Sequence, residues 1–258
     1  MAALPDVHFP ASAEEAASLF GDGAGVTVFA GGTILMPELT AGRLELGKTL
    51  LLGRAGLDTI TVDGPTTRIG AAVPVAALIA SPARILAAAA AKVGDVEIRA
   101  QGTVGGNVCA PPGREVPRGD LQAPLIALGA HVRSTGAGGE RVEPIEEFLA
   151  GDRATRLVLE LSFENAERPQ GYAAIGRPHA HAYTILSAAV ARDGDGLRVA
   201  VGGAGPTAVR SSAVEASGDP DDALKDVTPV DDALASARYR SKMLTVVIRR
   251  ALADMENA

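Results

Sequence analysis

Apolar and polar positions in the first part of the chain follow strand-like and helical periods in an irregular order. Ser12-Ala-Glu-Glu15 has the spacing of a capping box and predicts a helix that ends near Phe20, where Gly21 and Gly23 break it. Short runs rich in β-branched residues predict strands at residues 26–29, 49–52, 59–62, 67–71, 132–134 and 157–163. Helical spacing predicts helices at residues 34–39, 75–79, 83–93, 120–128 and 145–149. Asp120 stands where the N-cap of the fourth helix belongs.

The pattern changes after residues 164–171, a polar stretch with few side chains to bury, so we place a domain boundary there. Two apolar runs, 184–191 and 197–204, flank Arg192-Asp-Gly-Asp-Gly196 and predict a β-hairpin. Residues 219–232 are acidic and loop-like, and residues 239–255 form an amphipathic helix with Arg240, Arg249 and Arg250 among its polar positions. The fold class is therefore α+β, with a first domain at 1–165, divided into subdomains at about 1–55 and 56–165, and a smaller domain at 170–258.

Composition excludes several classes of function. The 258 residues carry a net charge of -7 and no cluster of Lys or Arg, which argues against nucleic acid or an anionic membrane as the main partner. The chain has neither a secretory leader pattern nor an apolar run long enough to span a bilayer, so we expect a cytoplasmic protein without an integral membrane segment. The single cysteine, Cys109, excludes an internal disulfide and a metal cluster held by several thiolates of this chain. Any iron–sulfur centre must belong to a partner.

Two glycine pairs are the strongest candidates for binding chemistry. Gly31-Gly32 and Gly105-Gly106 are each followed by a short polar residue, Thr33 and Asn107. A loop without Cβ atoms can aim several backbone N–H groups at a pyrophosphate, and two such loops can clamp one dinucleotide. Each pair alone is also compatible with an ordinary tight turn. Neither pair has the G-x-G-x-x-G or G-K-[ST] spacing, which disfavours a Rossmann unit and a P-loop.

The segments around these glycines resemble the FAD-binding medium subunits of molybdenum hydroxylases, the xanthine dehydrogenase and carbon monoxide dehydrogenase family. Phe29-Ala-Gly-Gly-Thr-Ile-Leu-Met-Pro37 is similar to the first FAD loop of that family, and Ile98-Arg-Ala-Gln-Gly-Thr-Val-Gly-Gly-Asn107 to the second. Asp120-Leu121 resembles the family's Asp-Leu helix start, where the carboxylate belongs to the flavin site. Gly202-Gly-Ala-Gly-Pro-Thr207 and Tyr239-Arg240 look like parts of its C-terminal domain.

The resemblance implies the FAD-binding fold of the vanillyl-alcohol oxidase and p-cresol methylhydroxylase group, followed by a small α+β domain of carbon monoxide dehydrogenase flavoprotein type. It further implies FAD as cofactor and a cytoplasmic assembly with a large molybdenum-cofactor subunit and a small [2Fe–2S] subunit, as a dimer of heterotrimers. In such an assembly this chain passes electrons from the partner's clusters to an external acceptor and has no catalytic acid or base of its own. The residues expected at the FAD are Ala30, Gly31, Gly32, Thr33, Ile34, Leu35, Thr103, Gly105, Gly106, Asn107 and Asp120.

Two functions of other classes remain open from the sequence. One is a self-contained FAD oxidoreductase, which would need its own acid or base over the flavin; the other is a flavin-free assembly subunit. The chain also departs from the family in three places. Residues 109–119 are longer than the usual segment, Ala173 and Ala174 follow Tyr172 where many relatives have a lysine, and Ala182 replaces an acid. The lysine's absence favours a quinone or dye over NAD as electron acceptor.

Two further candidates have simpler interpretations. His179-x-His181 places two imidazoles close together, but a metal site needs more ligands, so a polar loop is the better interpretation. Cys109 has no identifiable base partner, so we expect a small buried side chain rather than a nucleophile.

Overall fold

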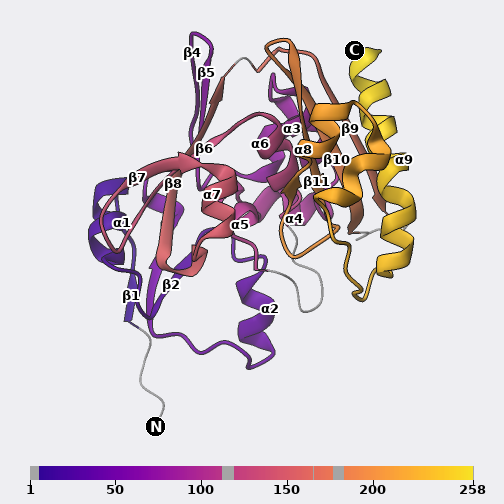
Figure 1. Ribbon diagram of the computed structural model, residues 1–258. Helices are drawn as coiled ribbons and strands as arrows, with labels where there is room; N and C mark the ends of the chain where they lie inside the picture. The colour runs from indigo at the N-terminus through magenta and orange to yellow at the C-terminus, as the bar shows by residue number, and fades with distance from the viewer. Residues whose placement is uncertain (1–5, 112–118, 165, 177–182, 258) are drawn as a thin grey trace.

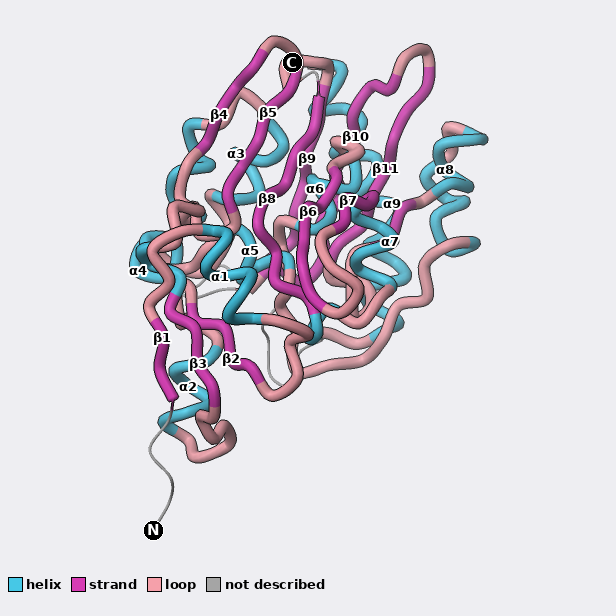
Figure 2. The backbone as a smooth tube through the Cα atoms, turned by 90° about the vertical axis from the view of Figure 1, so that its left-hand side faces the viewer, coloured by secondary structure: helices cyan, strands magenta, loops and turns pink. Residues whose placement is uncertain are grey.

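Three β-sheets with helices packed between and outside them make up the molecule (Figures 1 and 2). The computed structural model describes residues 6–257 apart from 112–118, 165 and 177–182. Its strands and helices alternate irregularly along the chain, as in the α+β class predicted from the sequence.

The N-terminal sheet is parallel, with strands in the order β1 (Asp6–His8), β3 (Lys48–Leu51), β2 (Val26–Phe29). Helix α1 (Ala13–Phe20) buries Ala16 and Phe20 in the same cluster as Leu50. Its capping box is confirmed, because the Ser12 hydroxyl accepts a hydrogen bond from the Glu15 backbone N–H at 3.2 Å. Helix α2 (Leu35–Thr40) follows β2 after the first glycine pair, as predicted. The three-residue strand β1 was not predicted, since it is too short to show a period.

The central sheet is antiparallel and five-stranded. Its order is β4 (Ile60–Asp63), β5 (Thr66–Gly70), β8 (Arg156–Glu164), β6 (His131–Gly136), β7 (Arg141–Pro144). The helical elements around it are η2 (Val75–Ala80), α3 (Arg84–Ala90), α4 (Val96–Gln101), α5 (Val104–Val108), α6 (Gln122–Ala127), α7 (Ile145–Ala150) and η3 (Arg153–Thr155), and η1 (Leu52–Arg54) precedes it. The sequence predicted most of these elements but not β7, α4, α5, η1 or η3.

Two local predictions in this region are wrong. The passage at residues 102–107, expected as a loop, contains the start of α5, because Thr103 caps it with its hydroxyl and the turn packs against β5. Asp120 is not the N-cap of α6: the helix begins at Gln122, and its cap is Leu121, which makes no side-chain capping bond. A turn intervenes in which the Gln122 N–H donates to the Gly119 carbonyl at 2.9 Å.

The C-terminal sheet is antiparallel, in the order β12 (Val209–Arg210), β11 (Gly196–Gly202), β10 (Thr184–Asp193), β9 (Gln170–Gly176). The predicted hairpin is confirmed as β10–β11, which turns at Gly194 with φ 59°. Strand β9 was not predicted, because its first residues continue the polar stretch. Helix α9 (Ala237–Glu256) covers one face of this sheet (Figure 1), and α8 (Ser212–Ser217) and η4 (Pro220–Lys225) lie before it.

The opposite face of the C-terminal sheet packs onto α6 and α3. Residues Ala189, Ala191 and Ala200 of that face belong to the same buried cluster as Leu125 and Leu161 of the central region. The division at residues 164–171 stays a prediction, since this cluster draws residues from both sides of it. Because small alanines line the contact, the C-terminal sheet and the helices α3 and α6 approach closely.

Arg240 corrects another expectation. It was placed among the polar positions of α9, yet its side chain is fully buried. Its guanidinium lies 2.6 Å from the Asp232 carboxylate and donates to the carbonyls of Val230 and Ala235. A charge can be buried in this way because each donor finds an acceptor.

Candidate functional site

The first glycine loop, residues 30–35, leaves the carboxyl end of β2 and enters α2. Among the described residues, the backbone N–H groups of residues 31–35 have no hydrogen-bond acceptor, and the first to find one is Met36, which donates to the Gly32 carbonyl at 2.8 Å. All six residues are half-buried, so the loop is open to solvent in part. Gly32 has φ 72°, a conformation that favours glycine. The loop thus presents five consecutive backbone donors that have no partner among the described residues.

The first loop lies directly against the start of the second. A Cβ on Gly31 would stand 1.9 Å from the Gln101 carbonyl oxygen, so only glycine permits this approach. The Thr33 hydroxyl lies 3.4 Å from where a Cβ of Gly102 would be. The structure therefore brings the two predicted loops together.

The second loop is built differently from the first. The Gly105 N–H donates to the Ala71 carbonyl at 2.8 Å, the Gly106 N–H to the Thr103 hydroxyl at 3.3 Å, and the Asn107 N–H to the Thr103 carbonyl at 2.9 Å. A Cβ on Gly105 would lie 2.8 Å from that of Ala71, so this glycine allows α5 to pack on the end of β5. The backbone donors of the second loop are taken up within the protein, and its contribution to a ligand has to come from other groups.

Asp120 stands beside the second loop in the turn before α6. The Asn107 side-chain oxygen accepts a hydrogen bond from the Leu121 N–H at 2.9 Å and joins the turn to α5. Gln122 extends this connection, because its side chain donates to the Val108 carbonyl at 2.9 Å and accepts from the Ala208 N–H at 3.1 Å. These bonds position Asp120 between the second loop and the C-terminal sheet.

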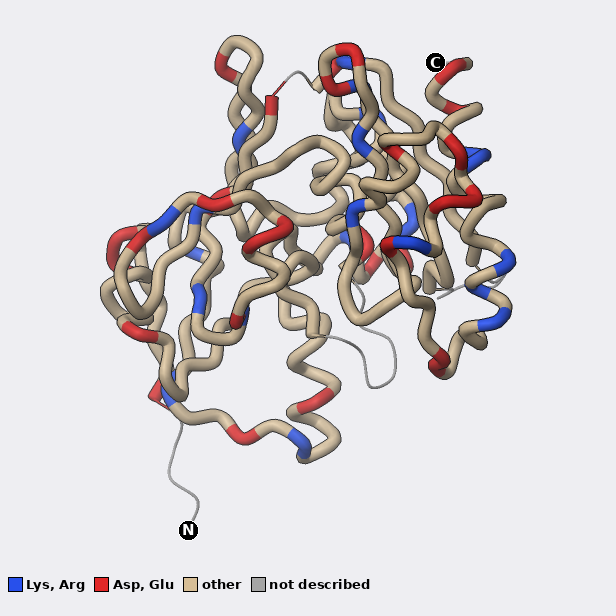
Figure 3. The backbone as a smooth tube through the Cα atoms, viewed as in Figure 1, with Lys and Arg blue, Asp and Glu red and all other residues tan. Residues whose placement is uncertain are grey.

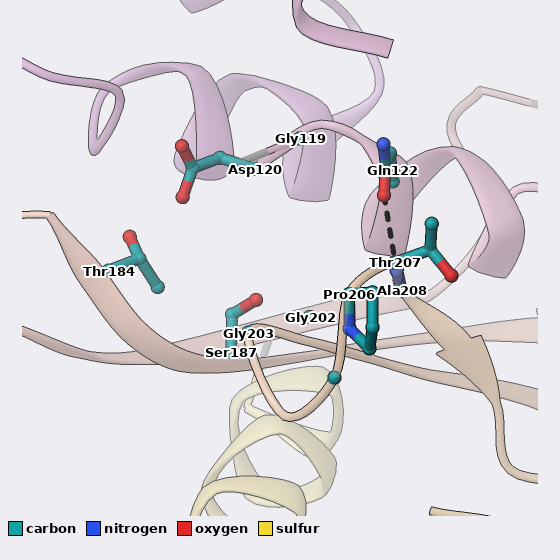
Figure 4. A pocket seen from close by; sticks show the side chains of 11 residues that line it. Gly119, Asp120, Gln122, Thr184, Ser187, Gly202, Gly203, Pro206, Thr207 and Ala208 are labelled. Atoms are coloured by element: carbon teal, nitrogen blue, oxygen red, sulfur yellow. Dashed lines mark hydrogen bonds between the residues drawn. The ribbon is translucent and has the colours of Figure 1, made fainter. Parts of the chain in front are cut away.

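A pocket opens between the Asp120 turn and the loop that follows β11 (Figure 4). Asp120, Thr184 and Ser187 bring polar side chains to it. Glycines at positions 119, 202, 203 and 205 also line the pocket and have no side chains to fill it. Sequence reasoning singled out Asp120 here but missed Gln122, Thr184 and Ser187. Thr184 and Ser187 are the polar residues of the otherwise apolar run 184–191 in β10. A polar residue within a buried strand is the sequence signal that could have identified Ser187.

Tyr172 lies behind this pocket on β9. Tyr172 pairs with Ala189 in the strand register and Ala174 with Ser187, so the side chains of these four residues share the face toward α6. The buried Tyr172 hydroxyl has no hydrogen-bond partner in the part of the chain that the structure describes; the Ser187 hydroxyl is near, but not in bonding geometry. Burial, and then the Asp120 carboxylate, raise the pKa of Tyr172 well above its ordinary value, so the phenol stays protonated.

Cys109 follows α5 and is half-buried. Burial of the sulfur raises the pKa of the thiol to about 12, against a small opposing effect of the Arg153 guanidinium. The group is therefore a neutral thiol at physiological pH. Arg153 itself donates to the carbonyls of Val108 and Ala110, which brings it to the end of the second loop.

Some candidates fall elsewhere. His179, His181 and Ala182 lie outside the described residues, as does most of the long segment at 109–119. Within the described ranges, no group of three or more His, Cys, Asp or Glu side chains is arranged to hold a metal ion. No helix in these ranges is long and apolar enough to cross a membrane.

Comparison with known proteins shows which family the chain belongs to. Residues 3–162 match the family described as the FAD binding domain in molybdopterin dehydrogenase. The chain is 29% identical to the carbon monoxide dehydrogenase medium chain of Hydrogenophaga pseudoflava, over 96% of this chain and 95% of that one. It is 30% identical to the 6-hydroxypseudooxynicotine dehydrogenase complex subunit alpha of Paenarthrobacter nicotinovorans, over 94% and 91%.

The fold gives the same answer. A solved carbon monoxide dehydrogenase from Hydrogenophaga pseudoflava, one that lacks the Mo-pyranopterin moiety of its molybdenum cofactor, superposes with a TM-score of 0.84 at 25% identity, covering 100% of this chain and 99% of that chain. The fold and the glycine loops therefore define an FAD-binding subunit of an oxidoreductase. The chain belongs to the family of FAD-binding medium subunits of molybdenum hydroxylases, and its cofactor is FAD.

Proposed function

We propose that this chain carries electrons through its FAD, from [2Fe–2S] clusters on a small partner subunit to an external acceptor. A large subunit with the molybdenum cofactor oxidises the substrate, and the assembly is a dimer of heterotrimers. FAD suits the task because it accepts two electrons and passes them on singly or together. This chain's own task is then to hold the cofactor in place beside its partners.

The observation that carries the proposal is the row of backbone donors in the first loop that have no acceptor in the part of the chain that the structure describes. A pyrophosphate is a doubly negative group, and backbone N–H groups from a glycine loop bind such groups without any lysine. Residues 31–35 supply five of them next to the second loop. We assign the backbone of Ala30, Gly31, Gly32, Thr33, Ile34 and Leu35 to the pyrophosphate side of the FAD.

The second loop has a different task in this proposal. Its N–H groups already donate within the protein, so Thr103, Gly105 and Gly106 shape the wall of the site and pack it on β5. Asn107 keeps its side-chain NH2 for the ligand while its oxygen holds Leu121. Asp120, which faces the pocket, is the acceptor for a hydroxyl or N–H of the cofactor.

Docking of the partners is assigned to α9 and the β10–β11 hairpin. Arg238, Lys242, Arg249 and Arg250 of α9 are exposed. Figure 3 marks Lys and Arg positions along this helix in blue, and the sequence from 237 to 253 contains no acid. These four basic residues contrast with the net charge of -7, although Arg249 lies 4.0 Å from the Asp221 carboxylate. They suit an acidic face on another subunit.

The test is to express the chain with its neighbouring subunits and to purify the assembly through a tag on this chain. The proposal expects a yellow complex that contains a larger and a smaller subunit and whose flavin is bleached when the substrate of the large subunit is added. A flavin that stays oxidised while the iron–sulfur clusters are reduced would contradict the electron-transfer role. A lone yellow chain that oxidises a substrate by itself would favour the self-contained oxidoreductase.

A further inference from the structure

Gln122 is the first residue of α6 and is almost completely buried, with 2% of its surface exposed. Both ends of its side-chain amide are bonded to backbone groups. The nitrogen donates to the Val108 carbonyl at 2.9 Å, and the oxygen accepts from the Ala208 N–H at 3.1 Å (Figure 4). Since one partner is an acceptor and the other a donor, only one orientation of the amide satisfies both.

These two bonds join segments that are far apart in the sequence. Val108 ends α5, which carries the second glycine pair, and Ala208 lies in the loop between β11 and β12 that forms the opposite wall of the pocket. Asp120 stands two residues before Gln122. If the loop that contains Ala208 moves away from α6, the hydrogen bond between Ala208 and Gln122 breaks. Gln122 also holds the end of the second flavin loop through Val108.

The Gln122 side chain packs against Gly119. Gly119 lies against it so closely that a Cβ at position 119 would stand 2.2 Å from the Gln122 amide nitrogen. Buried amides that lose a partner are left with an unsatisfied polar group, which is unfavourable in a low-dielectric interior. The amide therefore keeps the Asp120 turn and both walls of the pocket in one arrangement.

We propose that Gln122 is a positioning residue for the flavin site, which couples FAD binding by the second loop and Asp120 to the seating of the 202–208 loop. The inference rests on the proposed function, because it assumes that FAD occupies this pocket. It goes beyond that function because it assigns the coupling between FAD binding and the 202–208 loop to Gln122, a side chain that need not touch the cofactor. FAD binding then orders the C-terminal loop, and loss of that loop's contact weakens FAD binding by the same factor.

The test compares two buried glutamines in the full-length chain. Gln122→Met keeps the shape of the side chain and removes both hydrogen bonds. Gln170→Met is the matched control, because Gln170 is also 2% exposed and also bonds backbone groups on two segments, the Ile85 N–H at 3.1 Å and the Ala166 carbonyl. Gln170 bonds α3 and the turn before β9 and is not one of the residues that line the pocket.

Three quantities are measured for each variant: the melting temperature of the apoprotein, the FAD dissociation constant by fluorescence quenching, and hydrogen exchange of the Ala208 amide with and without FAD. We expect similar falls in melting temperature but a roughly tenfold weaker FAD affinity for Gln122→Met alone. In the wild type, FAD slows exchange at Ala208; in Gln122→Met it does not. Equal FAD affinities in the two variants, or equal losses, would overturn the proposal.

Gln122→Glu supplies a second readout, which a merely structural role would not give. A protonated carboxyl group both donates and accepts, whereas the carboxylate only accepts and cannot bond the Val108 carbonyl. FAD affinity of Gln122→Glu should therefore approach the wild-type value as the pH falls toward 5 and weaken as it rises toward 8, while that of the wild type changes less. A flat profile argues against the coupling. If the wild-type chain itself binds no FAD, the proposed function fails rather than this inference alone.

Discussion

Replacing Gly31 by alanine perturbs the contact on which the two flavin loops depend. The added methyl group would stand 1.9 Å from the Gln101 carbonyl oxygen and 2.7 Å from its carbon. Real Cβ atoms essentially never approach closer than 3.0 Å, so the first loop and the end of α4 must separate by about 1.1 Å. Overpacking of this kind costs about 1–3 kcal/mol. If this cost is transmitted in full to the cofactor contacts, FAD affinity falls roughly fivefold to 150-fold.

The assay is a fluorescence titration of the apoprotein with FAD, together with its melting temperature. Two controls separate the flavin site from general damage. Gly171→Ala creates the same clash elsewhere, since a Cβ there lies 1.9 Å from the Ala251 carbonyl oxygen, between β9 and α9. Gly53→Ala has no atom within 4 Å of the new methyl group and needs no positive φ, so it should change nothing.

We expect Gly31→Ala and Gly171→Ala both to lower the melting temperature and only Gly31→Ala to weaken FAD binding. A Gly31→Ala protein that melts earlier yet binds FAD as tightly as Gly171→Ala would refute the reasoning. The first loop would then be a packing element without contact to the cofactor.

Four other predictions concern separate parts of the molecule. Gly32→Val and Gly32→Asn should both reduce FAD occupancy. Valine should also destabilise the fold by about 1–2 kcal/mol, because asparagine tolerates the φ of 72° and valine does not. Occupancy is measured as FAD released on denaturation, and full occupancy in both variants contradicts the loop assignment. Asp120→Asn should weaken FAD retention during gel filtration, and unchanged retention would leave this carboxylate without a role at the cofactor. Burial raises the pKa of the Cys109 thiol from 9.0 to about 12, so the stability it contributes is complete below pH 9 and falls as the pH rises from 9 toward 12. Alkylation of the folded chain at pH 8 should accordingly be far slower than alkylation in denaturant, and equal rates would contradict the burial. With Ala173 and Ala174 in place of a lysine, the assembled complex should reduce a quinone faster than NAD; stopped-flow oxidation of the substrate-reduced complex decides this, and efficient NAD reduction overturns it.

The local parts of the site could be predicted from the sequence. The strand before Gly31, the glycine pair and the helix start at Leu35 follow one another within a few residues, so period and turn chemistry suffice to find them. The β10–β11 hairpin is equally local. Family likeness added the cofactor, which glycine pairs alone do not determine.

The rest depends on contacts between distant residues. Glycines disfavour helix, yet α5 forms at Val104–Val108 because Thr103 caps it and Ala71 receives the Gly105 N–H. Nothing near Gln122 in the sequence indicates that Ala208 will be its partner. Arg240 has the helical spacing of a surface residue, and its burial is explained by the positions of the Asp232 carboxylate and of the Val230 and Ala235 carbonyls.

The central claim is that FAD held by these loops receives electrons inside an assembly. It is tested most directly by rapid mixing of the purified complex with the substrate of its large subunit, following the flavin and the iron–sulfur absorbance together. We expect about one FAD per chain and flavin reduction that follows cluster reduction, with less bound FAD and a smaller flavin signal when Gly31→Ala replaces the wild-type chain. A complex that turns over its substrate at full rate without bound flavin, or whose flavin is never reduced, would contradict it.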